Sequence, residues 1–397
     1  ISLASKSVAN FGIFVHVSAS PTEKFAAQEL KKYLNQMSKA DFIITEKFNG
    51  KSIRVRTADK LPIIASGLVF PSLQGEEYGI FKRRQDLYLV GGSDMVVLHV
   101  IYNFLTCLGC QWILPDYDFF EGKSMNVPLQ TEFSYNFISD VVERPVFKYR
   151  KLCIEEGKSH NIENLLQLID WMPKARFNVL TFPIDYQGSG RVKWDDWREE
   201  LTSELKKRSI IIEVGEHGYQ NFLNARMEGG KLFEKHLEWF GMDNNGKRSS
   251  NLHAVFCTSN NDAVEYLNNN LLSYLMSHSE IDISDFWPPD SERWCECSNC
   301  VSLGCPNERH AMLVNMTVQF LLRRYTKIKL ECLAYSRYTK PPDQVLLDKN
   351  VLLDFCPINQ SFEYQIFNES RNIAEEHPEI VERLMPLWEK GNTGLFN

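Results

Sequence analysis

Four cysteines stand close together in this chain, at Cys295, Cys297, Cys300 and Cys305. Four thiolates can bind one tetrahedral ion, as in structural zinc sites, which take all four ligands from the protein. The C-x-C-x2-C-x4-C spacing differs from the two C-x2-C pairs of zinc ribbons, so a disulfide that pins the loop and free thiols stay open as alternatives. An iron–sulfur cluster also takes four cysteines, but no redox partner motif stands nearby. We expect a loop-shaping role, with zinc as the candidate metal and no cofactor required for catalysis.

Carboxylates and aromatic side chains form the second group of chemically capable residues. Such residues suit polyhydroxylated substrates, because aromatic faces stack on sugars while two carboxyl groups act at the anomeric carbon. Asp290 is the first choice for a general acid, since the apolar Trp287 and Pro289 beside it favour the protonated form. Glu216 is its expected partner carboxylate, with Asp285 in reserve. The residues expected to bind and orient the sugar are Arg150, His217, Trp287, Tyr335 and Asn359.

Other functions are less compatible with the sequence. A net charge of −7, from 44 basic and 51 acidic residues, disfavours nucleic acid as the partner. The apolar stretches are too short and too interrupted for a membrane span. A metal-dependent hydrolase is disfavoured because no HxH or HxxxH pair stands at a strand end. A non-catalytic carbohydrate-binding protein on a degenerate barrel stays open, since it would use the same residues without a competent carboxyl pair.

The segments that must position these residues alternate between strands and amphipathic helices. Strands are expected at 147–153, 178–184, 209–215, 253–257, 281–287, 329–335 and 350–355, and helices at 161–175, 194–208, 261–278 and 310–325. This alternation predicts a (β/α)8-type TIM barrel, in which side chains at the carboxyl ends of the strands face the active site. After a helix at 378–390 only GNTGLFN remains, so we expect a barrel that is incomplete at its carboxyl end. A doubly wound open sheet is the alternative, but it would need a glycine-rich phosphate turn where CIEEGKSH stands.

The first part of the chain predicts a smaller α/β domain. Strands are expected at 12–17, 41–45, 52–56 and 86–92, and helices at 21–37 and 93–109. The pattern loosens between 110 and 146, in a segment rich in proline, aromatic and turn residues. We therefore assign 1–140 to the small α/β domain and 141–397 to the barrel.

Several segments resemble known families. AAQELKKYLNQM, DLYLVGG and VVLHVIYNFLTCLGCQWILPD resemble the N-terminal α/β domain that precedes the barrel in α-glucuronidases and hexosaminidase-like glycoside hydrolases. EVGEHGY, FCTSN, FWPPDSERWCECSNC, LAYSRYTKPP and LLDFCPINQSF are similar to DUF4838, a family of unknown function common in gut Bacteroidetes.

The resemblance implies a glycoside hydrolase-like TIM barrel that acts on plant or host glycans, with an acidic or N-acetylated sugar as substrate. It also implies export to the periplasm or cell surface. The chain begins without Met, so we expect a processed product whose signal peptide has gone. The resemblance supplies no catalytic pair.

Overall fold

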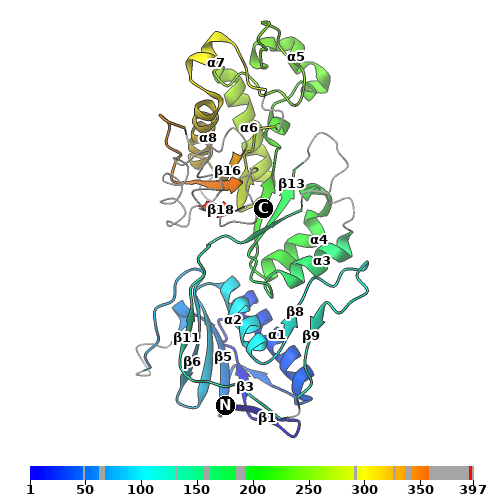
Figure 1. Cartoon of the computed structure of the whole chain (residues 1–397), viewed down its shortest axis with the longest axis vertical. Coiled ribbons are helices and arrows are strands. Elements are labelled where there is room, and N and C mark those ends of the chain that lie inside the picture. Colours follow the sequence, from blue (N-terminus) through cyan, green and yellow to red (C-terminus); the bar gives the residue numbers. More distant parts are fainter. Residues whose placement is uncertain are drawn as a thin grey trace, which may run out of the picture. The chain divides into compact units, whose positions relative to one another are not determined.

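The computed structural model describes residues 1–47, 50–61, 68–130, 132–154, 161–184, 193–289, 293–324, 328–335 and 342–356, and the backbone of the strand Thr393–Leu395. Its contacts group the chain into two units, both of mixed α/β structure (Figure 1). The first unit comprises Ile1–Arg150, His160–Asn178 and Trp197–Ile210. The second unit comprises Lys151–Ser159, Val179–Asp196 and Ile211–Asn397.

A six-stranded mixed sheet forms the centre of the first unit, in the order β11-β6-β7-β5-β3-β4. Its strands are β3 (Gly12–Phe14), β4 (Ile44–Thr45), β5 (Ser52–Thr57), β6 (Tyr78–Arg83), β7 (Asp86–Gly91) and β11 (Val141–Glu143). The four strands expected from the sequence pair in parallel, and β6 and β11 add antiparallel pairings at one edge. The sequence pattern did not reveal β6, which forms a hairpin with β7.

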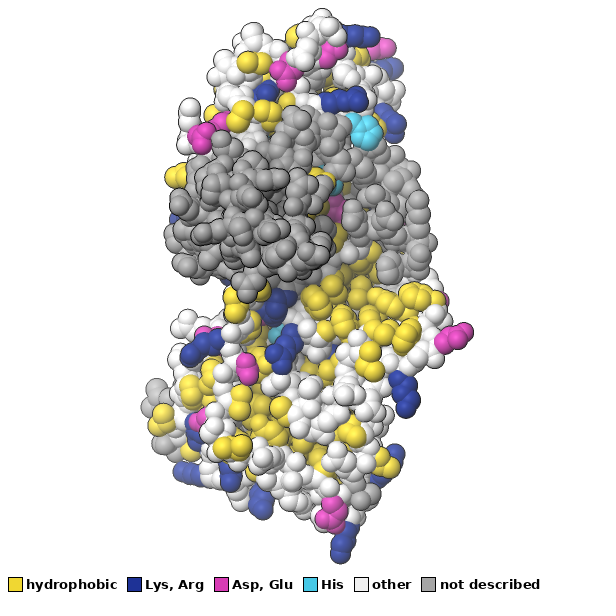
Figure 2. All heavy atoms as spheres, viewed as in Figure 1, with side chains coloured by type: hydrophobic (Ala, Val, Ile, Leu, Met, Phe, Trp, Pro, Cys, Tyr) yellow, Lys and Arg dark blue, Asp and Glu magenta, His cyan; other side chains and the backbone are white. Residues whose placement is uncertain are grey.

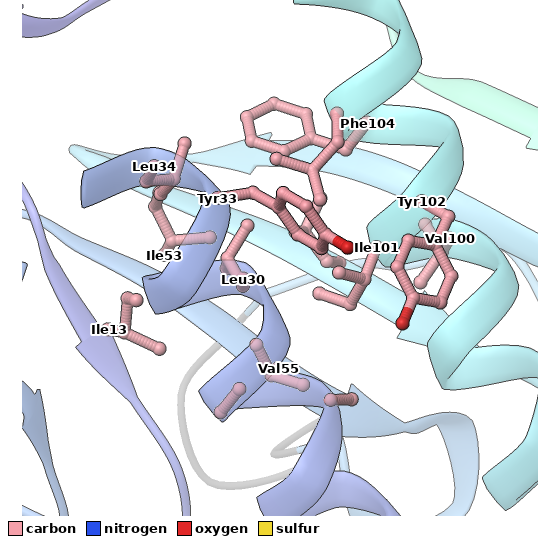
Figure 3. Packing of buried hydrophobic residues seen from close by; sticks show 14 of the residues in the cluster. Ile13, Leu30, Tyr33, Leu34, Ile53, Val55, Val100, Ile101, Tyr102 and Phe104 are labelled. Carbon is pink, nitrogen blue, oxygen red and sulfur yellow. The ribbon is translucent and has the colours of Figure 1, made fainter. Parts of the chain in front are cut away.

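Two long helices, α1 (Pro21–Ser38) and α2 (Asp94–Cys107), confirm the helices expected in this part of the chain. A capping box begins α1: Ser20 Oγ accepts from the backbone N–H of Glu23, and the Glu23 carboxylate accepts from the backbone N–H of Ser20. Leu30 of α1 and Ile101 of α2 lie in one buried cluster with Ile53 of β5 (Figure 3). Complete burial of such a side chain contributes about 1.5–3 kcal/mol, so this apolar layer is a main source of the unit's stability.

The first unit also contains smaller elements. They are β1 (Ser2–Ser5), β2 (Val8–Ala9) and β10 (Phe133–Ser134), which form a three-stranded sheet, the paired strands β8 (Gln111–Trp112) and β9 (Met125–Asn126), and the turn η1 (Ala58–Lys60). Two further helices, α3 (Ile162–Trp171) and α4 (Trp194–Lys207), were expected to belong to the barrel. By their contacts, α3 and the part of α4 from Trp197 onward group with the first unit.

A seven-stranded parallel sheet forms the second unit. Its strands are β12 (Lys151–Cys153), β13 (Val179–Pro183), β14 (Ile211–Gly215), β15 (Ile283–Asp285), β16 (Lys329–Tyr335), β17 (Val351–Cys356) and β18 (Thr393–Leu395). They pair in the order in which they occur along the chain. This order is that of a curled half barrel, and it differs from a doubly wound sheet, whose strand order reverses at a switch point.

The helices and turns of the second unit lie between these strands in the sequence. They are η3 (Tyr219–Phe222), η4 (Met227–Gly230), α5 (Leu232–Lys235), η5 (Leu237–Trp239), α6 (Asn261–Ser277), α7 (Ser298–Ser302) and α8 (Pro306–Leu322). The long helices α6 and α8 confirm those expected at 261–278 and 310–325.

Two strand predictions for this unit were wrong. Segment 253–257 is not a strand of the sheet; it makes one bridge, between Ala254 and Arg293, and β14 pairs directly with β15. A short apolar run fits a buried loop as well as a strand, and here the loop leads Cys257 to other thiols. Conversely, the terminal GNTGLFN segment contains β18, which pairs in parallel with β17. Its glycines and short length concealed the strand.

Two further features concern the basic side chains on the surface and the apolar character of the helices. On the face drawn in Figure 2, the Lys and Arg side chains of the described residues are scattered over both units. Among the described helices, none combines the length and the apolar character that crossing a membrane requires.

Candidate functional site

A buried lysine lies at the centre of the parallel sheet's polar interior. Lys151, the first residue of β12, places its Nζ 2.8 Å from Glu213 Oε1 and 2.7 Å from Glu331 Oε1, and it also pairs with Asp354. The three carboxylates come from β14, β16 and β17, so side chains of three other strands converge on this ammonium group. Burial alone would lower the pKa of Lys151, but the surrounding carboxylates outweigh it and raise that pKa well above its ordinary value.

Asp285 ends β15 and is the next carboxyl group of this interior. Its Oδ2 accepts a hydrogen bond of 2.9 Å from the backbone N–H of Glu216, and its Oδ1 has no hydrogen-bond partner among the described residues. Burial and the nearby charge of Glu213 raise the pKa of Asp285 well above its usual range. The pKa values of Glu331 and Asp354 are also raised, mainly by burial. The interior therefore favours protonated carboxyl groups.

The same carboxylates raise the question of a metal ion. Oxygens of Glu213, Asp285 and Glu331 lie within 4.8 Å of one another, a spacing that a divalent ion could bridge. Lys151 already bonds to Glu213 and Glu331 and supplies positive charge at this place. These residues form the charge cluster, with the Lys151 ammonium as its cation.

The turn after β14 has an unusual backbone. Gly215 has a φ of +152°, and a Cβ atom there would lie 2.6 Å from the Asp285 carbonyl oxygen, so only glycine fits. Glu216 follows in the left-handed conformation with a φ of +57°, which is strained for a residue with a side chain. Strain of this kind concentrates at functional sites, and here it brings Glu216 beside Asp285.

Glu216 also contacts a thiol. The Cys153 Sγ lies 3.1 Å from Glu216 Oε1, and burial together with the Glu216 charge raises the pKa of Cys153. The thiol therefore keeps its proton and donates it in a hydrogen bond to the carboxylate. Cys153, at the end of β12, thus helps to orient the Glu216 side chain.

An aromatic group lies next to these carboxyl groups. His217 Nδ1 is 2.7 Å from the Pro288 carbonyl oxygen, and because a carbonyl only accepts, Nδ1 carries the proton. The His217 ring lies edge-to-face with Trp287, at 5.3 Å between centroids, and 6.1 Å from the Tyr335 ring. The structure therefore brings together five of the predicted site residues: Glu216, Asp285, His217, Trp287 and Tyr335.

One other predicted residue lies elsewhere, and two fall outside the described residues. Arg150 belongs to the first unit, where its guanidinium pairs with Glu76 at 2.7 Å and donates to the carbonyls of Phe147 and Arg176. These bonds fix the backbone before β12. Asp290 and Asn359 lie outside the described residues, and their assigned roles stay predictions.

Sequence reasoning passed over the residues at the centre of the charge cluster. None of Lys151, Glu213, Glu331 and Asp354 was among the predicted site residues. A signal for them exists in IIEVG, KLECLAY and VLLDFC, each of which holds one acid within an apolar strand. Such an acid requires a buried partner, because an unpaired charge inside a protein is strongly disfavoured.

The cysteine cluster differs from the predicted set by one member. Sulfurs of Cys257, Cys295, Cys297 and Cys300 lie within 4.8 Å of one another, whereas Cys305 is exposed at the start of α8. Cys305 was wrongly included because sequence spacing favoured the nearest thiol. Cys257, distant in sequence, reaches the cluster because its segment runs beside Arg293.

Comparison with known proteins places the chain in a family. A family model for a domain of unknown function, DUF4838, matches residues 119–389. The chain belongs to the DUF4838 family. The DUF4838 match covers most of the chain, including all the described residues of the charge cluster and the cysteine cluster. A search among curated proteins finds no match.

Solved structures of glycoside hydrolases resemble the DUF4838 chain in fold. A β-N-acetylhexosaminidase from Bacteroides fragilis matches with a TM-score of 0.55 and 9% identity, covering 100% of this chain and 73% of that chain. A family GH115 4-O-methyl-α-glucuronidase with specificity for decorated arabinogalactans matches with a TM-score of 0.56 and 11% identity, covering 100% and 49%. A chitobiase from Flavobacterium johnsoniae matches with a TM-score of 0.55 and 12% identity, covering 100% and 57%. At such identities the likeness shows the fold, and the chain spans only part of each of these proteins.

Proposed function

We propose that the chain is a glycoside hydrolase that cleaves O-glycosyl bonds at the carboxyl ends of β14, β15 and β16. The observation that carries this proposal is the meeting of Glu216 and Asp285 with His217, Trp287 and Tyr335. Two carboxyl groups with different surroundings can divide the roles of acid and partner carboxylate in glycoside hydrolysis. The likeness in fold to glycoside hydrolases supports the same reaction class.

The surroundings suggest a role for each carboxyl group. Asp285, whose pKa is raised mainly by burial, retains a proton and suits the general acid. Glu216, which accepts from the Cys153 thiol, suits the second carboxylate, a nucleophile or base. Trp287 and Tyr335 supply aromatic surface for the sugar face. Asp290 stays the acid predicted from the sequence, and the experiment below includes it.

We further propose a neutral, N-acetylated sugar as the substrate in preference to a uronic acid. The described ionisable groups of the interior are mainly carboxylates, and the ammonium of Lys151 already bonds to three of them. A sugar carboxylate placed here would be desolvated and would find Lys151 already paired, whereas an uncharged N-acetyl group needs no counter-charge. We also propose that the protein is exported, as its family resemblance implies.

The test is hydrolysis of a panel of aryl glycosides and oligosaccharides that contain N-acetylhexosamine or glucuronic acid. We expect turnover of the N-acetylated substrates, with kcat/KM reduced about 10²–10⁴-fold in Glu216→Gln and in Asp285→Asn. Asp290→Asn is measured in parallel, and a loss confined to that variant would transfer the acid role to Asp290. Glu265→Gln, an exposed change on α6, is the matched control and should retain full activity.

A second candidate, carbohydrate binding without catalysis, is favoured by one observation. Glu216 and Asp285 are only 3% and 1% exposed, so both carboxyl groups of the proposed pair are enclosed by protein. Binding on a glycan array without hydrolysis of the same glycan would establish this alternative. It would also contradict the proposed hydrolase.

A further inference from the structure

Four cysteine sulfurs of the second unit lie close together. All four lie within 4.8 Å of one another, and Cys257 Sγ is 3.7 Å from both Cys297 Sγ and Cys300 Sγ. A zinc ion bound by four thiolates at about 2.3 Å keeps its sulfurs about 3.8 Å apart in a regular tetrahedron. We propose that Cys257, Cys295, Cys297 and Cys300 bind one structural zinc ion as four thiolates.

The sulfur distances distinguish this site from the other states of a cysteine cluster. A disulfide needs two sulfurs about 2.05 Å apart, and all four cysteines are free thiols in the structure. An iron–sulfur cluster distributes its thiolates over several iron atoms, which places them further apart than the ligands of a single ion. The common limit of 4.8 Å therefore fits one mononuclear site.

Hydrogen-bond donors surround the sulfurs. The backbone N–H of Met242 lies 3.3 Å from Cys295 Sγ, and the Arg248 guanidinium lies 3.7 Å from the same atom. The Ser259 hydroxyl lies 3.4 Å from Cys257 Sγ and 3.9 Å from Cys297 Sγ, where it can donate to a thiolate. One zinc ion with four thiolates has a net charge of −2, and donors of this kind stabilise such a centre and orient its ligands. A set of neutral thiols would have much less need of an arginine.

The proposed ion would join two segments that are far apart in sequence. Cys257 precedes α6, whereas the other three cysteines follow β15 in the segment 293–300. The two segments already meet where the Val255 N–H donates to the Arg293 carbonyl at 2.8 Å. The segment that follows β15 includes Trp287 and Pro288, which contact His217. Zinc would therefore fix the loop that carries part of the candidate site, and with four protein ligands it would leave no position open for substrate.

The test is the metal content of the full chain, expressed with added zinc and purified without chelators. Elemental analysis should find about one zinc ion per chain in the wild type, and Cys257→Ser should lower this below about a fifth. Cys305→Ser is the matched control, because Cys305 lies next to the cluster in sequence but outside it in space, and it should keep its zinc. The two variants also distinguish two ligand sets. The set proposed from the structure contains Cys257, whereas the set predicted from the spacing contains Cys305.

A second set of measurements detects the metal in the wild-type protein, so it does not require that a variant folds. Titration of the native wild type with an organomercurial should release zinc as the cluster thiols react. Replacement of zinc by Co²⁺ should give the thiolate charge-transfer and d–d absorption of a tetrahedral site. Cys257→His, which still offers a ligand, should retain metal.

Four results would overturn the proposal. They are zinc-supplied wild-type protein without bound metal, iron in place of zinc, an intact mass that shows a disulfide among the four cysteines, and zinc lost from Cys305→Ser but kept by Cys257→Ser. The proposed hydrolase does not depend on any of them, because its carboxyl pair lies outside the cysteine cluster.

Discussion

The interiors of the two units contain different kinds of side chain. In the first unit, α1 and α2 cover the sheet with apolar residues such as Leu30 and Ile101, both completely buried. In the second unit, the parallel sheet holds Lys151 among carboxylates from three other strands. Apolar burial stabilises a fold, whereas buried charges usually cost more in desolvation than their attraction returns. Buried ionisable groups of this kind are typical of functional sites, so the second interior is the better candidate for the site of function.

The first unit also buries charges, but its ratio of cations to carboxylates is different. Asp170 pairs with both Lys174 and Arg208, and although burial alone would raise the pKa of Asp170, these two cations outweigh it and lower that pKa. In the second unit one cation serves several carboxylates, and the pKa of Asp285 is raised instead. An acid with two cations is a structural pair, whereas surplus acids that retain protons are suited to acid–base chemistry.

The largest expected effect comes from removal of the central cation. Lys151→Met should lower the free energy of unfolding by about 3–5 kcal/mol at pH 7, because it leaves several carboxylates buried without a counter-charge. Chemical denaturation at several pH values measures the effect. Carboxyl groups with a raised pKa in the folded state stabilise it most below their unfolded pKa and lose this contribution as pH rises through the folded pKa. The loss should therefore be smaller at pH 5 than at pH 8.

The control for this change is Lys235→Met, which removes an exposed lysine of the same unit. It should alter stability by less than about 1 kcal/mol, as is usual for an exposed ion pair. Equal stability of Lys151→Met and the wild type would show that the second interior does not depend on its cation.

A cavity in the apolar interior of the first unit is the counterpart of the Lys151→Met change in the second unit. Leu30→Ala should lower the free energy of unfolding by about 2–5 kcal/mol, because it removes buried methyl groups and leaves a void. The loss should be the same at pH 5 and pH 8, since no titrating group is involved. Leu129→Ala, at a position 61% exposed in the same unit, should change little. A strong pH dependence of the Leu30→Ala loss would contradict the proposed contrast between the interiors.

A substitution in the carboxylate group should raise stability. Asp285→Asn keeps an oxygen for the Glu216 N–H but cannot ionise, so we expect a gain of about 1–2 kcal/mol at pH 8. Because the pKa of Asp285 is raised in the folded state, its contribution to stability falls as pH rises through that pKa. The gain of the variant should therefore grow with pH. Thermal denaturation across pH 5–8 measures it, with the exposed Asp116→Asn as the unchanged control.

The smallest expected effect is the loss of a helix cap in the first unit. Ser20→Ala removes the acceptor for the Glu23 N–H at the start of α1 and should cost about 1 kcal/mol. Denaturation at neutral pH measures this change. Ser273→Ala, in the exposed middle of α6, should be neutral or slightly stabilising because alanine favours helix. A Ser20→Ala protein as stable as the wild type would show that the capping box does not limit the first unit.

Local signals in the sequence account for much of the fold. The helix α1 could be predicted because Pro21 and the apolar spacing of residues such as Leu30 and Leu34 indicate both its start and its buried face. The parallel strands of the second unit could be predicted from apolar runs between amphipathic helices. Segment 253–257 failed, because apolar character alone does not distinguish a strand from a loop that carries a buried Cys257.

The candidate site was predictable where a rule of topology applied. Carboxyl ends of parallel strands meet at one edge, and this rule brought together Glu216, His217, Trp287 and Tyr335. It failed for Arg150, whose bonds to Glu76 and to backbone carbonyls depend on tertiary contacts of the first unit. The fourth cysteine was missed for the same reason, since no sequence spacing shows that Cys257 approaches Cys300.

The division of the chain into units has a consequence for its dissection. The first unit draws on Ile1–Arg150, His160–Asn178 and Trp197–Ile210, so the polypeptide alternates between the two units before it stays in the second. No single peptide bond separates them. A fragment that ends at residue 140 would lack α3, and a fragment that begins there would carry α3 without its packing partners. A fragment that corresponds to the first unit therefore needs three separate segments of the chain.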